Sequence, residues 1–502
     1  MRKFLLLAAL ASVYTTYSQK NANPKIFADS ITEEGLKKHL YIIAGRDFEG
    51  RETATEGQHK AAAYIQNCFK TLGLLPGNKE SYEMYFPVYQ DSLEEVNITI
   101  NDREFLMYED VDASLSANYN SVLLGSEIVF AGYGISDSAQ DDYQGLDVKG
   151  KIAMVLSGVP PDRLQAQVNK KIFNPYGKQD AAQLRGAAAL LVIEEDFPRK
   201  KASEKSKMYL NPFKETIHLN TYHVSEKIAR TIMGKDYDAA KNGNIQPKSY
   251  NENIILKFSK SITRLQSSDV LGYMEGTDLK DQLLILSAHY DHLGKKDTTI
   301  YYGADDDGSG TVSVLEIAEA FAKAKAAGQG PRRSILFLAN SGEEKGLWGS
   351  EYYTNHPVYP LDKTTADLNI DMIGRIDPNR KHGDSTNYVY VVGDDKLSSE
   401  LHPISESLNR KYTKLELDYK FNDPNDPQRI YYRSDHYNFA RKGVPVIFYF
   451  DGVHKDYHKP TDTPDKINYD ILAKRAKLVF YTAWDMANRN DMLKRDKQLP
   501  KK

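Results

Sequence analysis

Short, uninterrupted apolar segments recur in the second half of this chain. They span residues 283–288, 335–339 and 444–450 and are rich in aliphatic and aromatic side chains. Apolar residues at every position, rather than at alternate positions, are typical of strands covered on both faces, as in a parallel sheet. Polar residues follow at or near the carboxyl end of each segment. We therefore expect three buried strands with polar side chains close to their carboxyl ends.

Helical periodicity separates these strands. Between the first two, Val314, Ile317, Ala318 and Phe321 follow the i, i+3, i+4, i+7 spacing of a helix that buries one face. Residues 469–486 have similar spacing and predict a final helix. Strands that alternate with helices predict an α/β fold with a doubly wound, mostly parallel sheet.

The middle of the chain has a different character. Residues 127–135, 149–158 and 186–193 predict a β, β, α, β series, and the strand ends of this series carry none of the candidate metal ligands. We expect a smaller, β-rich α+β domain inserted into the main one. The predicted boundaries are 1–18 for a leader, 19–115 with 249–490 for the main domain, 116–248 for the insert and 491–502 for a charged tail.

The first 18 residues have the features of a secretory signal peptide: basic residues, an apolar run, then small and polar residues. The apolar run is shorter than the roughly 20 residues that a membrane span needs. We expect cleavage near Ser18 and an exported protein, periplasmic or secreted, without membrane attachment. Cys68 is the only cysteine, which rules out an intrachain disulfide and favours a buried structural thiol.

Composition excludes some partners. The chain has 502 residues, of which 41% are hydrophobic and 27% charged, an ordinary globular profile. Its net charge of -3 predicts no general attraction to nucleic acid or anionic membranes. Nothing in the composition calls for a polyanionic partner, and the sequence does not predict an oligomeric state.

Side chains that bind divalent metals lie near the ends of apolar segments. In the H-x-D pair formed by His289 and Asp291, the imidazole is a good zinc ligand and the carboxylate can orient its second nitrogen. Taken singly, each candidate has an ordinary alternative, such as a surface histidine or an acidic loop before a helix. Together they favour a metal site, in which one carboxylate can bridge two metals. The set comprises His289, Asp306, Glu344, Asp371 and His458.

Glu343 and Glu344 are the most informative pair. Two adjacent carboxylates that follow an apolar strand repel one another and desolvate poorly unless a cation compensates them. One of them can bind a metal while the other accepts a proton from water.

The order of these motifs resembles peptidase family M28, whose members are zinc peptidases and chiefly aminopeptidases. The resemblance covers most of residues 36–486, and the insert resembles a protease-associated domain, which in such proteins covers part of the active-site cleft. The counterparts of the family motifs, in order, are HYD from His289, GADDDGSG from Gly303, EE from Glu343, NIDM from Asn369 and YHKPTD from Tyr457.

The resemblance implies a site for two Zn²⁺ ions per chain. His289 and Asp371 would hold one zinc, Glu344 and His458 would hold the other, and Asp306 would bridge both.

The resemblance also implies roles for the neighbouring residues. Glu343 would be the general base, Tyr457 would stabilise the oxyanion, and Asp291 would steady His289. Asp307 departs from the family, in which asparagine is common at that position. Because three aspartates are consecutive, Asp305 remains an alternative bridge.

These expectations describe an exported dizinc exopeptidase that hydrolyses the N-terminal bond of peptides. One alternative is a carboxypeptidase of the same fold, and another is a receptor-like homologue that binds peptides or proteins without catalysis. A single-zinc acyltransferase that cyclises N-terminal glutamine is a third. A further motif either lines the substrate pocket or makes ordinary loop hydrogen bonds, and it consists of Arg433, Ser434, Asp435 and His436.

Overall fold

The chain forms two compact units. Unit 1 contains Met1–Phe86 and Gln266–Lys502, and unit 2 is Pro87–Leu265. The predicted signal peptide at 1–18 lies outside the described residues. The computed structural model describes residues 23–160, 163, 170–200, 204–213, 215–243 and 246–499.

Unit 1 is built on a mixed β-sheet whose four central strands are mutually parallel. In spatial order these are β15 (Arg333–Asn340), β12 (Leu279–His289), β16 (Thr364–Ile370) and β19 (Val446–Phe450). The outer strands include β17 (Tyr388–Val392), antiparallel to β19, β18 (Glu416–Asp418) beyond β17, and β11 (Ile254–Met274), antiparallel to β15. The predicted apolar strands are therefore the parallel centre of the sheet, and the antiparallel strands lie outside it.

Both faces of the central strands are buried, as the uninterrupted apolar pattern predicts. On β12, Leu284 and Leu286 point into one hydrophobic core, and Leu283 and Ile285 point into another. Helices that contribute to the first core are α2 (Glu33–Ile43), α3 (Glu56–Thr71), α7 (Gly310–Ala326) and α11 (Tyr469–Asn488). The second core contains residues of α8 (Trp348–Asn355) and α10 (His436–Arg441).

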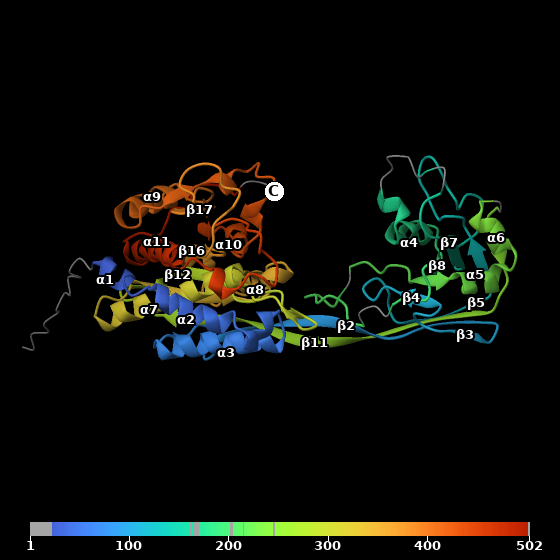
Figure 1. Ribbon diagram of the computed structural model, residues 1–502, viewed down its shortest axis with the longest axis horizontal. Coiled ribbons are helices and arrows are strands. Elements are labelled where there is room, and N and C mark those ends of the chain that lie inside the picture. The colour runs from blue at the N-terminus through green and yellow to red at the C-terminus, as the bar shows by residue number, and fades with distance from the viewer. Residues whose placement is uncertain are drawn as a thin grey trace, which may run out of the picture. The chain divides into compact units, whose positions relative to one another are not determined.

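The helices α2 and α11 begin at residues whose side chains cap them. Thr32 accepts a hydrogen bond from the backbone N–H of Gly35 at the start of α2, and Asn468 accepts one from Ile471 at the start of α11. In Figure 1 the blue helices α2 and α3 lie beside the yellow α7, so helices from the two sequence segments of unit 1 pack together. Cys68 of α3 is half-buried against this core, and burial raises the pKa of its thiol.

Smaller elements complete unit 1. They are α1 (Pro24–Ala28), β1 (Leu75–Pro76), β13 (Lys295–Lys296), β14 (Thr299–Ile300) and α9 (Leu401–Tyr412).

Unit 2 has its own six-stranded sheet and its own cores. The strands are, in spatial order, β10 (Lys248–Tyr250), β6 (Ile128–Phe130), β7 (Ile152–Leu156), β8 (Ala189–Glu194), β9 (Thr221–Ser225) and β4 (Val111–Ala113). The pairs from β6 to β9 are parallel. Its helices are α4 (Pro175–Leu184), α5 (Glu226–Met233) and α6 (Asp236–Lys241). The β, β, α, β series expected from the sequence corresponds to β6, β7, α4 and β8.

Unit 2 extends beyond the predicted insert at 116–248. Two long strands, β2 (Glu83–Ile100) and β11, contain residues of both units. Val96 and Ile98 of β2 and Leu256 and Phe258 of β11 are buried in a core of unit 2. The strands β3 (Arg103–Phe105) and β5 (Ser121–Gly125) pair with them. In β11 the two buried parts are separated by the mostly polar stretch 259–266, but the strand itself continues through it, so the boundary falls inside a strand rather than in a loop. Across the described part of the chain, no helix is both long and apolar enough to cross a membrane.

Candidate metal centre

The predicted ligands meet at one edge of the unit 1 sheet. The strand β12 ends at His289, Asp371 directly follows β16, and the 3-10 turn Glu343–Lys345 follows β15. Parallel strands present their carboxyl ends at the same edge, so these side chains converge. Asp306 reaches the same place from the π-helical segment Ala304–Ser309, which leads into α7.

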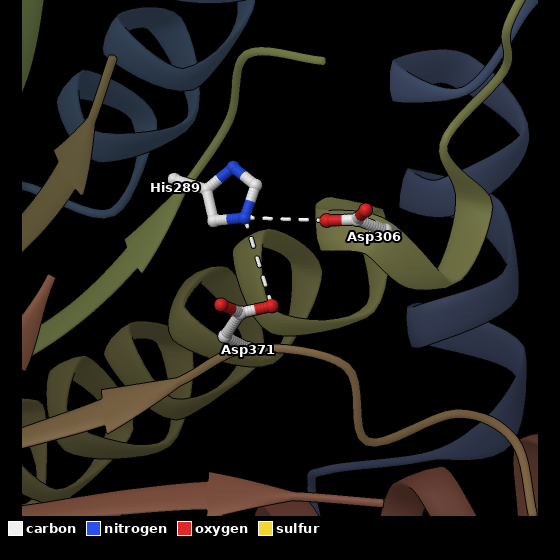
Figure 2. Close-up of side chains that lie close together, drawn as sticks. All are labelled: His289, Asp306 and Asp371. Atoms are coloured by element: carbon white, nitrogen blue, oxygen red, sulfur yellow. Dashed lines mark ion pairs between the residues drawn. The ribbon is translucent and has the colours of Figure 1, made fainter. Parts of the chain in front are cut away.

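His289 faces two carboxylates (Figure 2). Its Nε2 atom lies 3.4 Å from Oδ1 of Asp306 and 3.6 Å from Oδ1 of Asp371. The same nitrogen is 3.8 Å from Oε2 of Glu343. His289 is buried, and within the described residues its Nε2 has no hydrogen-bond partner. One ligand atom from each of His289, Asp306 and Asp371 lies within 4.8 Å of the others, which is close enough to share a metal ion.

Asp306 directs its other oxygen towards a second group. Its Oδ2 is 3.1 Å from Nε2 of His458, and that nitrogen is 3.2 Å from Oε2 of Glu344. His292, which the sequence analysis did not select, has its Nδ1 2.8 Å from Oε1 of Glu344. Ligand atoms of His292, Asp306 and Glu344 also lie within 4.8 Å of one another. Asp306 therefore belongs to both groups, as a bridging carboxylate would.

The two aspartates beside Asp306 point elsewhere. Asp305 accepts a hydrogen bond from the backbone N–H of Gly374 at 2.7 Å and lies 3.2 Å from the Nε2 atom of His454. Asp307 accepts hydrogen bonds from three backbone amides, and burial raises its pKa well above the usual range. The amides belong to His289, at 3.2 Å, Gly310, at 2.9 Å, and Met372, at 3.1 Å. Asp307 thus ties together three segments of the site, and Asp306 is the member of the run that faces both histidines.

Burial and neighbouring charges shift the pKa values of Glu343 and His458. Burial raises the pKa of Glu343 well above its ordinary value; His289 lowers it, while Glu344 and Asp371 raise it. Burial lowers the pKa of His458, but the carboxylates of Asp306 and Glu344 outweigh this effect and raise it to about 10. The carboxylates of Asp306 and Glu344 therefore favour a positive charge beside them, which a proton on His458 or a metal cation can supply.

The residues present fit a divalent metal. Buried polar atoms nearly always have partners, but in the described structure several here have none: Nε2 of His289, both ring nitrogens of His292, Oδ2 of Asp306 and Oε1 of Glu344. Imidazole nitrogens and carboxylate oxygens are the donors that zinc binds with short, near-tetrahedral geometry. The orphaned atoms and the donor set together indicate zinc.

Asp291 acts on two parts of the site. The Nδ1 atom of His289 is 3.1 Å from the backbone oxygen of Asp291 and 3.7 Å from its carboxylate. The carboxylate accepts hydrogen bonds from the hydroxyl of Thr53, at 2.7 Å, and from the backbone N–H of Glu343, at 3.2 Å. Asp291 therefore holds His289 chiefly through its backbone and positions the Glu343 turn with its side chain.

Tyr457 lies at the open side of the cluster. Its ring stacks on His458 with the ring centroids 3.8 Å apart. Its hydroxyl oxygen accepts a hydrogen bond from Nη2 of Arg433 at 3.0 Å. Because the oxygen is already an acceptor, its proton is free to be donated to another group.

A small pocket with one polar and one apolar wall adjoins the cluster. It is bounded by Asp306, Glu343, Asp371, Arg433 and Tyr457, and its apolar wall consists of Met372, Ile430, Phe448, Phe450 and Val453. An apolar side chain placed there would lie directly beside the candidate metal ligands.

Of the four residues predicted to line this pocket, only Arg433 does so. The other three, Ser434, Asp435 and His436, are buried behind the wall, because α10 begins at His436 and turns them into the core. Ser434 accepts a hydrogen bond from the side-chain amide of Asn369, Asp435 accepts one from the hydroxyl of Ser350, and His436 stacks on the ring of Phe448.

The sequence analysis also missed a buried arginine. Arg51 is fully buried, and its guanidinium donates hydrogen bonds to four backbone carbonyls. Those of Tyr290, Tyr302 and Gly303 lie next to the segments that carry His289 and Asp306, and that of Ile43 lies at the end of α2. An arginine in a short, polar N-terminal loop gives no sequence signal for such a position. His292 was visible as a second histidine in HYDH, but a loop histidine alone is weak evidence.

Comparisons with known proteins agree with this geometry. Residues 269–483 match the model of peptidase family M28. A probable leucine aminopeptidase of Trichophyton verrucosum is 29% identical over 214 residues, covering 41% of this chain and 55% of that protein. Leupeptin-inactivating enzyme 1 of Streptomyces exfoliatus is 27% identical over 254 residues, covering 46% and 52%. The chain thus spans about half the length of these curated relatives.

Solved structures share the fold. The aminopeptidase from Aneurinibacillus sp. strain AM-1 superposes with a TM-score of 0.52 at 18% identity, covering 95% of this chain and 100% of that chain. BSAP, a zinc aminopeptidase from Bacillus subtilis, gives 0.50 at 19% identity, covering 94% and 98%. The segment that resembles peptidase family M28, residues 269–483, contains the whole candidate metal centre, from His289 to His458.

Proposed function

We propose that this protein is a zinc exopeptidase that removes N-terminal residues from peptides and uses two zinc ions per chain. The observation that carries the proposal is the position of Asp306. Its two carboxylate oxygens face different histidines, Oδ1 facing His289 and Oδ2 facing His458. A carboxylate shared in this way suits a pair of metals. The names of the similar proteins, a leucine aminopeptidase and a zinc aminopeptidase among them, support the same activity.

The ligands divide between two positions. His289 and Asp371 would hold one zinc, Glu344 and His458 the other, and Asp306 both. When bound, such ions polarise a peptide carbonyl and make water more acidic.

The remaining side chains supply proton transfer and charge stabilisation. Glu343 is not needed as a ligand in this division, and it lies 3.8 Å from the ligand nitrogen of His289. It would accept the proton of the attacking water and return it to the leaving amine. Tyr457 would donate its free proton to the oxyanion of the tetrahedral intermediate. The tyrosine oxygen accepts the hydrogen bond from Arg433, so the hydroxyl proton remains available for this donation.

The pocket wall indicates the preferred substrate. Met372, Ile430 and Phe450 offer an apolar surface beside the ligands, so peptides with an apolar N-terminal residue should be cleaved best. Burial of one such side chain is worth about 1.5–3 kcal/mol, which corresponds to a preference of roughly tenfold or more over a small polar residue.

Arg433 favours a second candidate, a carboxypeptidase. It is the basic side chain among the described residues that line the pocket, and a guanidinium can bind a C-terminal carboxylate. In an aminopeptidase, Arg433 would instead position Tyr457 through its hydrogen bond to the hydroxyl oxygen. In a carboxypeptidase, Arg433→Met should raise KM sharply, because the substrate carboxylate loses its partner. In an aminopeptidase the same change should act mainly on kcat through Tyr457.

The experiment that tests the proposal is digestion of a defined peptide mixture by the zinc-loaded protein, followed by mass spectrometry of both peptide ends. Stepwise loss from the N-terminus, abolished by a chelator and restored by zinc, is the expected result. Loss from the C-terminus would establish the carboxypeptidase instead. Intact peptides from a protein shown to hold zinc would contradict both.

Unit 2 and the N-terminus complete the proposal. We assign unit 2 as a protease-associated-like domain, supported by its separate parallel sheet and by its insertion between the two parts of unit 1. We also expect export after removal of residues 1–18. N-terminal sequencing of the protein secreted by its host would show Gln19 or a close neighbour as the first residue.

A further inference from the structure

His292 is buried at the metal centre without a hydrogen-bond partner. Its side chain is 0% exposed, and within the described structure neither ring nitrogen makes a hydrogen bond. A neutral imidazole has one donor and one acceptor nitrogen, and leaving both unpaired in the interior costs free energy. Its environment must therefore supply a partner of another kind.

The chain fixes His292 in this position from both sides. Its backbone N–H donates to the backbone oxygen of Arg51 at 3.1 Å. Its ring lies against Gly303, which has φ of +55°, and a Cβ atom at that position would overlap the ring. A glycine is thus required where the imidazole enters the site. The ring edge also packs on the ring of His458, with the centroids 5.9 Å apart.

The ligand atoms lie close enough together to share a metal. Ligand atoms of His292, Asp306 and Glu344 lie within 4.8 Å of one another. Nδ1 of His292 is 2.8 Å from Glu344 and 3.9 Å from Asp306. Nε2 of His458 is 3.2 Å from Glu344 and 3.1 Å from Asp306. Both histidines therefore lie within 3.9 Å of the same two carboxylates.

A hydrogen bond to Glu344 does not explain the contact. The 2.8 Å separation is short enough for one, but the oxygen lies away from the direction of the ring N–H, so the geometry of a hydrogen bond is not met. Two ligands of one metal ion give such a contact, because their ligand atoms lie side by side and both point at the ion rather than at each other. Asp306 is common to both groups and completes the second one, because its Oδ2 lies 3.9 Å from Nδ1 of His292.

We propose that His292 is a direct ligand of the zinc ion held by Glu344, Asp306 and His458. This position would then have two imidazoles and two carboxylates, whereas the position at His289 and Asp371 has one imidazole. The inference rests on the proposed function, since it presupposes that zinc occupies the site. It makes the two positions chemically different, and the second should bind zinc the more tightly.

The test uses cobalt(II) and zinc binding rather than activity. In His292→Cys a thiolate replaces the imidazole. If residue 292 contacts the metal, the cobalt-loaded variant acquires a near-ultraviolet sulfur-to-cobalt charge-transfer band. The parent protein is the control for Cys68, which lies in α3 and should give no such band. A folded His292→Cys variant that binds two cobalt ions without this band would overturn the proposal.

Zinc affinity gives a second readout. Loss of a residue that only supports a ligand weakens metal binding by about 10–100-fold. Because His292 is proposed as a direct ligand, His292→Ala should weaken the binding of one zinc ion by at least about 100-fold, as His458→Ala should. His39→Ala is the matched control, because His39 forms a comparable contact with Glu316, at 3.8 Å, away from the site. A His292→Ala affinity within tenfold of the parent would also overturn the assignment. If the unaltered protein binds no zinc, the proposed function fails and not this inference alone.

Discussion

Replacing Arg51 should destabilise unit 1 more than its place in an N-terminal loop suggests. The guanidinium is fully buried and donates to the backbone oxygens of Tyr290 at 2.7 Å, Ile43 at 2.9 Å, Tyr302 at 2.8 Å and Gly303 at 2.9 Å. Tyr290 directly follows the ligand His289, and Gly303 opens the segment that carries Asp306. One side chain therefore fixes two of the backbone segments that hold the metal centre.

The magnitude follows from these bonds. Arg51→Met keeps an apolar stem and removes every donor, which leaves the carbonyls of Tyr290, Ile43 and Tyr302 without this partner, whereas that of Gly303 still accepts from the backbone N–H of Gly308 at 3.1 Å. Each lost partner costs about 1–3 kcal/mol. The low end applies, because burial of the guanidinium is itself unfavourable and lowers the pKa of Arg51 to about 10. The expected loss is about 3 kcal/mol, or roughly 3–5 °C in the unfolding midpoint of a chain of this size.

The assay is thermal and urea unfolding of the zinc-free protein, monitored by tryptophan fluorescence and circular dichroism. Removing the metal first separates stability from metal binding, which shifts the midpoint by mass action. Arg410→Met is the control: Arg410 is exposed and pairs with Glu406 one helical turn away, and its loss should cost less than about 0.5 kcal/mol. An Arg51→Met midpoint within about 2 °C of the parent would refute the argument that these hydrogen bonds hold the segments together.

Three further predictions concern single carboxylates. Glu343→Gln should keep two zinc ions by elemental analysis while kcat falls by about 10²–10⁴-fold; undiminished turnover would remove Glu343 from the mechanism. Asp306→Ala should lower bound zinc to one or none per chain, and two retained ions would rule out the bridging role. Burial raises the pKa of Glu316 from 4.5 to about 7. The stability linked to this shift is present below pH 4.5 and is lost as the pH rises through 7. Glu316→Gln should therefore unfold like the parent near pH 4.5 and be more stable than the parent by about 2 kcal/mol at pH 8 in urea titrations. Equal stability of variant and parent at both pH values would contradict the raised pKa of Glu316.

Much of the fold was predictable because one pattern dominates it. The strands at 283–288 and 335–339 are apolar at every position except Ser287, and this follows directly from burial on both faces. Their carboxyl ends then had to lie at one edge, which made His289 and Glu344 candidates for the same site. The extent of unit 2 was not predictable in this way. The strand β11 has residues in the cores of both units. Its apolar positions indicate which residues are buried, but not in which core.

The pocket residues show a different limit. Arg433 to His436 are consecutive and polar, and a pattern cannot say which of them face the substrate. The structure separates them because Asp435 and His436 begin α10. A turn of helix at that point sends Arg433 to the pocket and the other three into the interior. Sequence reasoning located the segment correctly but could not assign the direction of each side chain.

The run of three aspartates makes the same point about the metal centre. All three are buried carboxylates beside a helix start, and by residue type each could be the bridge. The backbone decides between them. Asp307 is occupied by three amide groups, and Asp305 by the amide of Gly374. Asp306 alone of the three directs its oxygens at His289 and His458. A bridging ligand is thus defined as much by the hydrogen bonds that occupy its neighbours as by its own chemistry, and those bonds come from segments that the sequence places far away.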